Sequence, residues 1–163
     1  MGLCAIFPVM NTQPAHPPRM IPFQKYGHPV WFITFGTLDR RPILARAEVY
    51  RSLVDFGARQ APRGIALGRH VVMPDHIHLF LRLAPPYETG ATVGFLKKAM
   101  SAALTRVGEK APHWQPGYFD HLVRDARGYS GKWEYVYQNP VRAGLVESAE
   151  QWPYSGEIVP IVY

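Results

Sequence analysis

The sequence predicts an α+β fold of the ferredoxin-like (RRM-like) kind. Its elements follow the order β-α-β-β-α-β, giving a four-stranded antiparallel sheet with helices on one face, and a C-terminal helix follows. Two observations lead to this order. Short β-branched and aromatic runs alternate with longer stretches of helical spacing. The turn dipeptide Pro74-Asp75 alone separates the second and third apolar runs, which indicates a hairpin.

The first half of the chain contains three of these elements. Pro29–Phe35 is a β-branched and aromatic run and is expected to form a strand. Ala47–Gln60 is expected to be a helix because its apolar residues fall on one stripe. Gly64–Met73 and His76–Leu83 are expected to be the two strands of the hairpin.

The second half predicts two helices and one strand. In Thr92–Val107 apolar residues recur at helical spacing, and Thr92 is expected to cap that helix. Tyr118–Arg124 has strand character. A helix is expected from Ser130 to about Asn139, with Pro140 either at its end or opening a short helix.

Composition limits the class of protein. The 163 residues suit one domain, and 47% hydrophobic residues can build a core. The net charge of +6 favours an anionic partner, most commonly nucleic acid, although an uncommitted basic surface is an open alternative. The lone Cys4 excludes an internal disulfide and a multi-cysteine zinc site, so a cytoplasmic, nucleoid-associated location is expected. No apolar run approaches the roughly 20 residues that span a membrane.

Three segments are expected along the chain. Residues 1–28 have frequent prolines and are interpreted as a flexible leader. Residues 29–156 are expected to form the main folded domain, and residues 157–163 a C-terminal tail.

His76 and His78 are candidate metal ligands. In a strand they project to one face while Ile77 projects to the other, so two imidazoles can chelate one divalent ion. The alternative is that both simply lie on a half-exposed sheet face.

Tyr135 and Asn139 are the second candidate pair. Four residues apart on a helix, they share a face, where tyrosine can act as a covalent nucleophile and the amide oxygen as a hard ligand. Other aromatic residues of this segment are alternative candidates, namely Tyr129, Trp133 and Tyr137. Tyr137 lies about 200° around the helix from Tyr135 and is therefore a candidate core residue.

Four sequence segments contain or surround these candidate residues. In chain order they are Trp31-Phe32-Ile33-Thr34-Phe35, then Val71-Val72-Met73-Pro74-Asp75-His76-Ile77-His78-Leu79, then Trp114-Gln115-Pro116-Gly117-Tyr118-Phe119-Asp120-His121, and finally Trp133-Glu134-Tyr135 through Asn139-Pro140 to Val146. With them the chain resembles the HUH single-strand DNA transposases, most closely the REP-associated tyrosine transposases.

The resemblance implies specific roles. His76, His78 and Asn139 would hold a divalent metal, Mg or Mn, and Tyr135 would be the nucleophile. The implied activity is cleavage and rejoining of hairpin-bearing single-stranded DNA through a 5′-phosphotyrosine intermediate. Residues that could contact the DNA are Lys97, Lys98, Trp114, Arg124, Arg127, Lys132 and Arg142.

Other functions remain open at this stage. A catalytically silent DNA-binding regulator would keep the same fold, as would an RNA- or DNA-binding module. A longer replication or relaxase-type nickase would share the metal and the tyrosine. The oligomeric state, monomer or homodimer, is also open.

Overall fold

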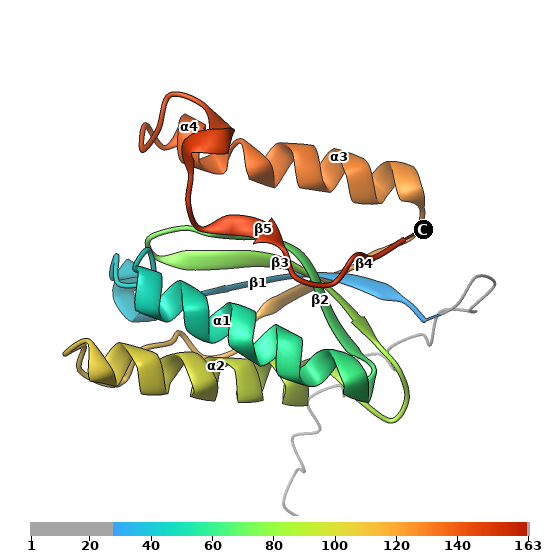
Figure 1. Ribbon diagram of the computed structural model, residues 1–163, viewed down its shortest axis with the longest axis horizontal. Helices are drawn as coiled ribbons and strands as arrows, with labels where there is room; N and C mark the ends of the chain where they lie inside the picture. Colours follow the sequence, from blue (N-terminus) through green and yellow to red (C-terminus); the bar gives the residue numbers. More distant parts are fainter. Residues whose placement is uncertain (1–27, 163) are drawn as a thin grey trace, which may run out of the picture.

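The computed structural model describes residues 28–162, so the expected leader lies outside the described residues except for His28. The helices and strands are β1 (Val30–Gly36), α1 (Ala47–Gln60), β2 (Ile65–Val72), β3 (His76–Leu83), α2 (Thr89–Arg106), β4 (Phe119–Val123), α3 (Ala126–Tyr137), α4 (Asn139–Arg142) and β5 (Ser155–Glu157). Short 3-10 turns lie at Leu38–Arg40, Ala61–Arg63 and Ala149–Gln151. The predicted order of elements is confirmed (Figure 1).

The sheet has five strands in the order β4-β1-β3-β2-β5, with every neighbouring pair antiparallel. The four expected strands are present, and the prediction of four is corrected by β5. This strand reads Ser-Gly-Glu and pairs with β2 between Arg69–Val71 and Ser155–Glu157. None of these three residues is β-branched or aromatic, so their own preference for a strand is weak. They form a strand because the edge of β2 offers unpaired backbone groups for hydrogen bonding.

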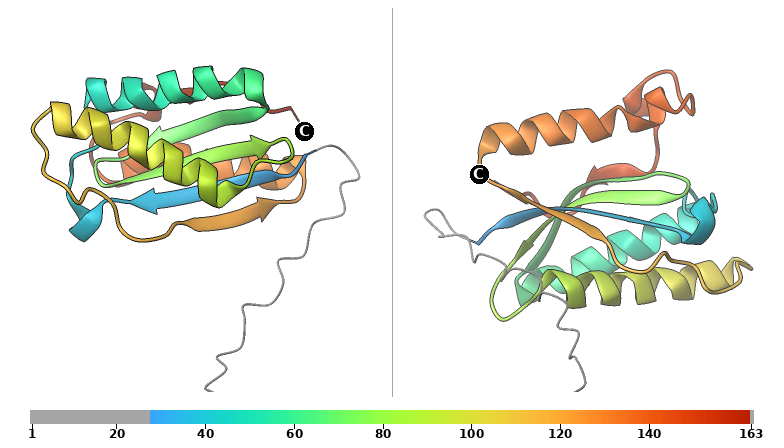
Figure 2. Two further views of the ribbon diagram at one scale, coloured as in Figure 1. Left: turned by 90° about the horizontal axis from the view of Figure 1, so that it is seen from below. Right: turned by 180° about the vertical axis from the view of Figure 1, so that it is seen from behind.

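Each face of the sheet is covered by its own hydrophobic core. Figures 1 and 2 show α1 and α2 together on one face and α3 on the opposite face. Along β3, Ile77, Leu79 and Leu81 belong to the core under α1 and α2, whereas Phe80 belongs to a second core under α3. The strand therefore alternates between two buried faces.

Two helix starts differ from the prediction. The helix α2 begins at Thr89 after the N-cap residue Glu88, and Thr92 lies inside it, donating its hydroxyl to the Glu88 carbonyl at 2.8 Å. The helix α3 begins at Ala126, four residues before the expected start. The side chain of Asp125 caps it by accepting from the Gly128 N–H at 2.7 Å.

The end of α3 settles the role of Pro140. The helix ends at Tyr137, and Pro140 occupies the first turn of α4, where its missing N–H costs no helical hydrogen bond.

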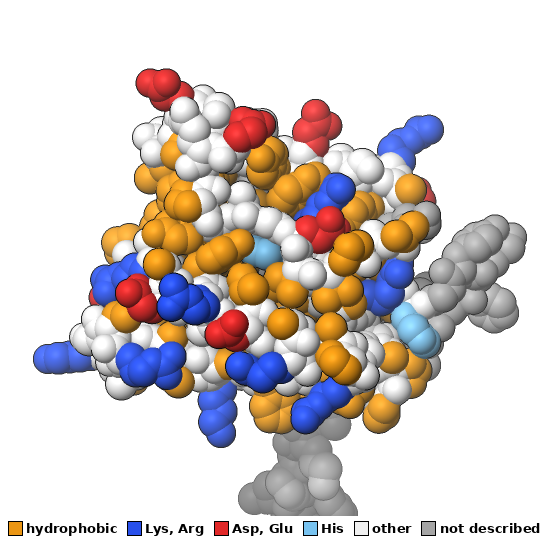
Figure 3. Space-filling view, viewed as in Figure 1, with side chains coloured by type: hydrophobic (Ala, Val, Ile, Leu, Met, Phe, Trp, Pro, Cys, Tyr) orange, Lys and Arg blue, Asp and Glu red, His pale blue; other side chains and the backbone are white. Residues whose placement is uncertain are grey.

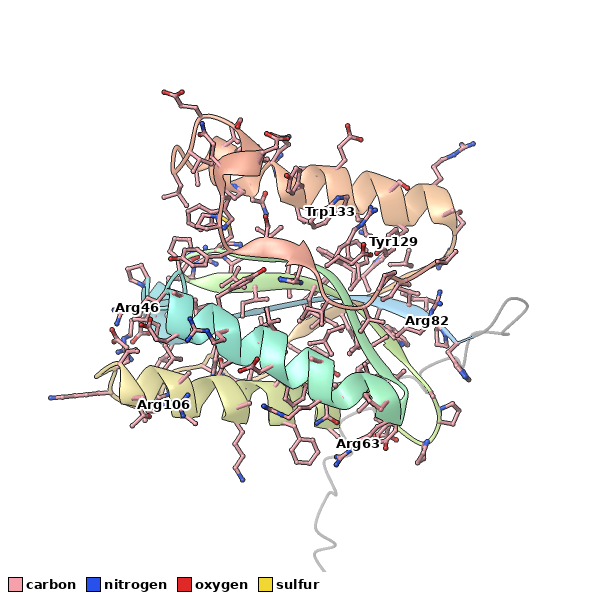
Figure 4. The ribbon with its side chains drawn as sticks, viewed as in Figure 1. Arg46, Arg63, Arg82, Arg106, Tyr129 and Trp133 are labelled. Carbon is pink, nitrogen blue, oxygen red and sulfur yellow. The ribbon has the colours of Figure 1, made fainter. Side chains whose placement is uncertain are left out.

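Aromatic packing holds α3 on the sheet. Tyr129 and Trp133 project from α3 toward the sheet (Figure 4), and the Tyr129 ring lies 4.3 Å from that of Phe80. The guanidinium of Arg69, on β2, lies 5.5 Å from the centroids of both α3 rings. These contacts fix the helix over the central strands and therefore fix the position of its exposed side chains.

The segment expected as a tail continues the fold. Glu157 belongs to β5, the Val159 N–H donates to the Leu67 carbonyl at 2.9 Å, and Ile161 is buried. A Cβ at Gly68 would meet the end of the Ile161 side chain at 2.7 Å, so a larger residue there would require Ile161 to shift. The folded domain therefore includes residues beyond 156.

We expect Leu79→Ala to lower the free energy of unfolding by about 2–5 kcal/mol, because the side chain is fully buried at the centre of the sheet. Urea unfolding followed by circular dichroism measures this change. Leu145→Ala, at an exposed position, is the control and should change stability little. Equal stability of the two variants would contradict the placement of Leu79.

His70 predicts a pH dependence of stability. Burial lowers the pKa of this imidazole below 6.5, partly opposed by its hydrogen bond to the Gly68 carbonyl. The unfolded chain therefore binds the proton more readily, and the free energy of unfolding falls as the pH drops below 6.5. His70→Asn should make this slope shallower in urea unfolding at a series of pH values. An unchanged slope would show that His70 does not contribute.

Candidate active site

His76 and His78 lie side by side on the α3 face of β3. On the neighbouring strand β1, Gly36 pairs with His76 and Thr34 pairs with His78. The centroids of the two imidazole rings lie 4.8 Å apart, with 84° between the ring planes. Ile77 is fully buried on the other face. The predicted common direction of the two imidazoles is confirmed.

Each imidazole is oriented through its Nδ1. The Nδ1 of His76 lies 2.6 Å from Asp75 Oδ1, and the other oxygen of that carboxylate pairs with Arg40 Nε at 2.7 Å. The Nδ1 of His78 lies 2.8 Å from the Thr34 hydroxyl. Since one nitrogen of each ring is used in this way, both Nε2 atoms are left for a ligand.

His78 is held in its neutral form. Burial, together with the neighbouring charges of His76 and Arg142, lowers the pKa of this imidazole from 6.5 to about 4. Its ring also stacks on Phe32, with 5.5 Å between centroids and 12° between planes. A neutral imidazole at pH 7 is the form that binds a metal.

The donor set suits a divalent ion only in part. Among residues 28–162 no cluster of three or more His, Cys, Asp and Glu side chains could hold a metal. A metal ion held by the two Nε2 atoms would need further oxygen ligands, and the predicted ligand set takes one of them from Asn139.

Tyr135 lies on the exposed side of α3, with 66% of the residue accessible. The guanidinium of Arg142 lies 4.0 Å from the centroid of its ring, and Arg142 Nη2 donates to the Tyr135 carbonyl at 2.6 Å and to Asn139 Oδ1. The predicted common face of Tyr135 and Asn139 is therefore present, with Arg142 bridging them. Tyr137 is half-buried and packs on Trp133 at 5.0 Å.

The C-terminal end of α3 and α4 lies on the same side of the sheet as the two histidines. Arg142 is close enough to act on the charge of His78, and Lys132 Nζ lies 5.3 Å from the ring centroid of Phe32, which stacks on His78. Neither Tyr135 nor Asn139 has a hydrogen bond to His76 or His78 within the described part of the chain. Arg142 is the residue that links the two halves of the site.

Sequence reasoning missed Thr34, Arg40 and Asp75. Thr34 could have been found from the alternation of β1, which places it on the face of Phe32. Asp75 directly precedes His76 but was interpreted only as a turn residue. The pairing of Arg40 with Asp75 depends on a backbone bend after β1 and has no sequence signal of its own.

The expected DNA-contacting residues lie on two faces. Lys97 and Lys98 are on α2, and Lys97 Nζ donates to the carbonyls of Gln115 at 3.0 Å and Gly117 at 2.6 Å. Lys132 and the exposed Arg127 are on α3, and the exposed Arg124 lies just before that helix. Figure 3 shows several Lys and Arg side chains over α1 and α2. The predicted set is divided between α2 and α3, which cover opposite faces of the sheet.

Trp114 is half-buried and packs against the core under α1 and α2. Its indole N–H donates to the Ser101 hydroxyl at 2.8 Å and to the Lys97 carbonyl at 3.1 Å, and its ring packs edge-on against Phe35 at 5.3 Å. These contacts orient the ring, and stacking of a base on Trp114 stays a prediction.

Comparison with known proteins decides the family. The model of the family "Transposase IS200 like" matches residues 32–137, which include most of β1, both histidines and Tyr135. This chain belongs to the family of IS200-like transposases. The resemblance inferred from the sequence segments is thereby confirmed.

Relatives of this transposase include two REP-associated proteins. A Haemophilus influenzae protein named as a REP-associated tyrosine transposase is 30% identical over 95 residues, which are 52% of this chain and 54% of that protein. The REP-associated tyrosine transposase of Escherichia coli K12 is 26% identical over 127 residues, which are 77% of this chain and 74% of that protein. The chain thus spans about half the length of the first relative and three quarters of the second.

A solved structure shares the fold of the transposase. The REP-associated tyrosine transposase bound to a REP hairpin superposes with a TM-score of 0.63 at 22% identity, covering 83% of this chain and 82% of that one. The predicted class is confirmed, with a fifth strand in this chain. None of the described helices has the length and hydrophobicity to cross a membrane.

Proposed function

We propose that this transposase cleaves and rejoins hairpin-bearing single-stranded DNA, with Tyr135 as the nucleophile. The observation that carries the proposal is the docking of α3 and α4 on the same face as His76 and His78, with Arg142 between the two pairs. The hairpin bound by the REP-associated structural relative supports DNA of this form as the substrate.

Tyr135 is accessible enough to meet a phosphate without rearrangement of the core. Its phenolic oxygen attacks the scissile phosphorus while the bond from phosphorus to the 3′ oxygen breaks. The phenolic proton passes to water, and the leaving oxygen takes up a proton to become a free 3′ hydroxyl. A 3′ hydroxyl later attacks the phosphotyrosine and releases Tyr135, so the energy of the broken bond is retained in the link.

Arg142 prepares this region for a phosphate. A guanidinium has five donor N–H groups, and only Nη2 is used by Tyr135 and Asn139. The remaining donors can pair with a phosphate oxygen next to the tyrosine.

A divalent ion, Mg or Mn, would be held by the Nε2 atoms of His76 and His78. Asn139 would join them once its amide oxygen is released by Arg142. When bound, the ion would supply positive charge at the phosphate. Asp75 and Thr34 keep the imidazoles oriented for this purpose through their Nδ1 contacts.

A second function, DNA binding without cleavage, has one observation in its favour. Arg142 engages the Asn139 oxygen, and within residues 28–162 the histidines have no hydrogen bond to Tyr135. A regulator that only binds DNA would keep this arrangement when DNA is bound. The experiments below separate the two functions because only the first produces a covalent adduct.

Tyr135→Phe should abolish the covalent protein–DNA adduct, because the variant lacks the attacking oxygen, while DNA affinity stays nearly unchanged. Denaturing gels of a labelled hairpin with single-stranded tails, incubated with Mn²⁺, measure the adduct. Tyr137→Phe is the matched control on the same helix and should keep the adduct. Persistence of the adduct in Tyr135→Phe would place the nucleophile elsewhere, and no adduct with the parent protein would favour the regulator.

Removal of the metal or its ligands should stop cleavage. We expect EDTA, His76→Ala and His78→Ala each to abolish the adduct. Asp75→Asn should weaken Mn²⁺ affinity by about 10- to 100-fold because the carboxylate no longer orients His76. Paramagnetic titration with Mn²⁺ measures the affinity, with His121→Ala, an exposed histidine of β4, as the control. Normal Mn²⁺ binding by His76→Ala would refute the ligand assignment.

A further inference from the structure

An exposed phenylalanine lies in line with the histidine pair. Phe119 of β4 pairs with Thr34 of β1, and Thr34 pairs with His78 of β3. Directly opposed residues of antiparallel strands project to the same face, so these three side chains form one row across the sheet. At about 4.8 Å per strand, Phe119 lies about 10 Å from β3. The residue is 64% exposed, so its ring is available to a ligand.

A pocket opens between Phe119 and His76. Its volume is about 370 Å³, which lies in the range of small-molecule sites. Thr34 and Gly36 belong to its β1 side, and Arg40, Gln115 and Phe119 are among its other lining residues. The lining therefore joins an aromatic ring, a cation and hydrogen-bonding groups within one small volume.

The loop that forms one wall is fixed before any ligand arrives. The Gln115 N–H donates to the Gly36 carbonyl at 3.0 Å, and Lys97 holds the carbonyls of Gln115 and Gly117. Tyr118 is tied to α2 by a 2.9 Å hydrogen bond between its hydroxyl and that of Thr89. A wall anchored at these points loses little entropy when a ligand binds.

Arg40 supplies a charge at the edge of this pocket. Asp39 and Arg40 both have left-handed backbone conformations, with φ of 54° and 56°. This bend brings Arg40 Nε within 2.7 Å of Asp75 while the side chain stays 63% exposed. The guanidinium is thus held beside His76 and faces solvent.

We propose that this pocket binds one unpaired nucleotide of the DNA tail, next to the phosphate that is cut. Its base stacks on Phe119, and its phosphate pairs with Arg40. The inference rests on the proposed function and adds a contact that selects single-stranded DNA, because a base inside a duplex cannot reach the ring. A phosphate alone would use Arg40 but not the aromatic wall.

The test measures binding with the full chain carrying Tyr135→Phe, so that no cleavage occurs. The probe is a fluorescein-labelled DNA hairpin with a ten-nucleotide single-stranded tail on each side, and a set of probes carries one abasic site at each tail position in turn. Phe119→Ala should weaken binding of the intact probe by roughly 5- to 100-fold, and Phe119→Trp should restore it. Phe95→Ala is the matched control, because this phenylalanine is 66% exposed on α2, away from the pocket. Circular dichroism confirms that each variant is folded.

The decisive result is non-additivity at one tail position. At that position, the Tyr135→Phe protein with Phe119 intact should bind the abasic probe as weakly as its Phe119→Ala variant binds the intact probe. The Phe119→Ala variant should bind the abasic probe with no further loss of affinity. Arg40→Gln should lower the slope of log affinity against log salt by about one phosphate contact. Additive losses at every position, or no effect of Phe119→Ala, would overturn the proposal even if the Tyr135 adduct forms. No binding by the parent protein would instead overturn the proposed function, and this inference with it.

Discussion

The alternation of side chains along β3 is the constraint on which the rest of the structure depends. This strand lies at the centre of the sheet, and Ile77, Leu79 and Leu81 fill the core under α1 and α2. The same alternation directs His76 and His78 to the opposite face. A slip of one residue would turn both imidazoles toward α1 and α2 and the aliphatic side chains toward α3, so the register of the core also fixes the site. Burial and chemistry are specified by one strand and cannot vary independently.

The second face adds a helix to this platform. Tyr129 and Trp133 pack on the sheet and on Arg69, which fixes α3 along its length. Because residues on one side of α3 are committed to that core, Tyr135 is left on the exposed side. Arg142 then joins this exposed side to the histidines through its contact with the tyrosine ring and its charge near His78. A helix held by large apolar contacts can present a reactive group without depending on that group for its position.

Patterns with a strong period were predictable, and features set by long-range contacts were not. The bounds of α1 and β3 match their predictions because amphipathic spacing and strand alternation are local properties. The Ser-Gly-Glu strand β5 owes its conformation to the edge of β2, and the start of α3 depends on one capping carboxylate. In the site, the shared face of the histidines follows from strand geometry. The bond between Arg142 and Asn139, and the pairing of Arg40 with Asp75, require a fold that brings separate turns together.

Arg142 illustrates how one cation can act in two states of a site. In the described arrangement it occupies the Asn139 oxygen and covers the Tyr135 ring, so two of the proposed functional groups are satisfied within the protein. A phosphate entering beside Tyr135 would compete for the same guanidinium, since charge-assisted pairs with phosphate are stronger than bonds to a neutral amide. Transfer of Arg142 to the phosphate would free the amide oxygen at the moment when a ligand for a divalent ion is needed. The arrival of DNA and the completion of the metal site would then be coupled through a single side chain.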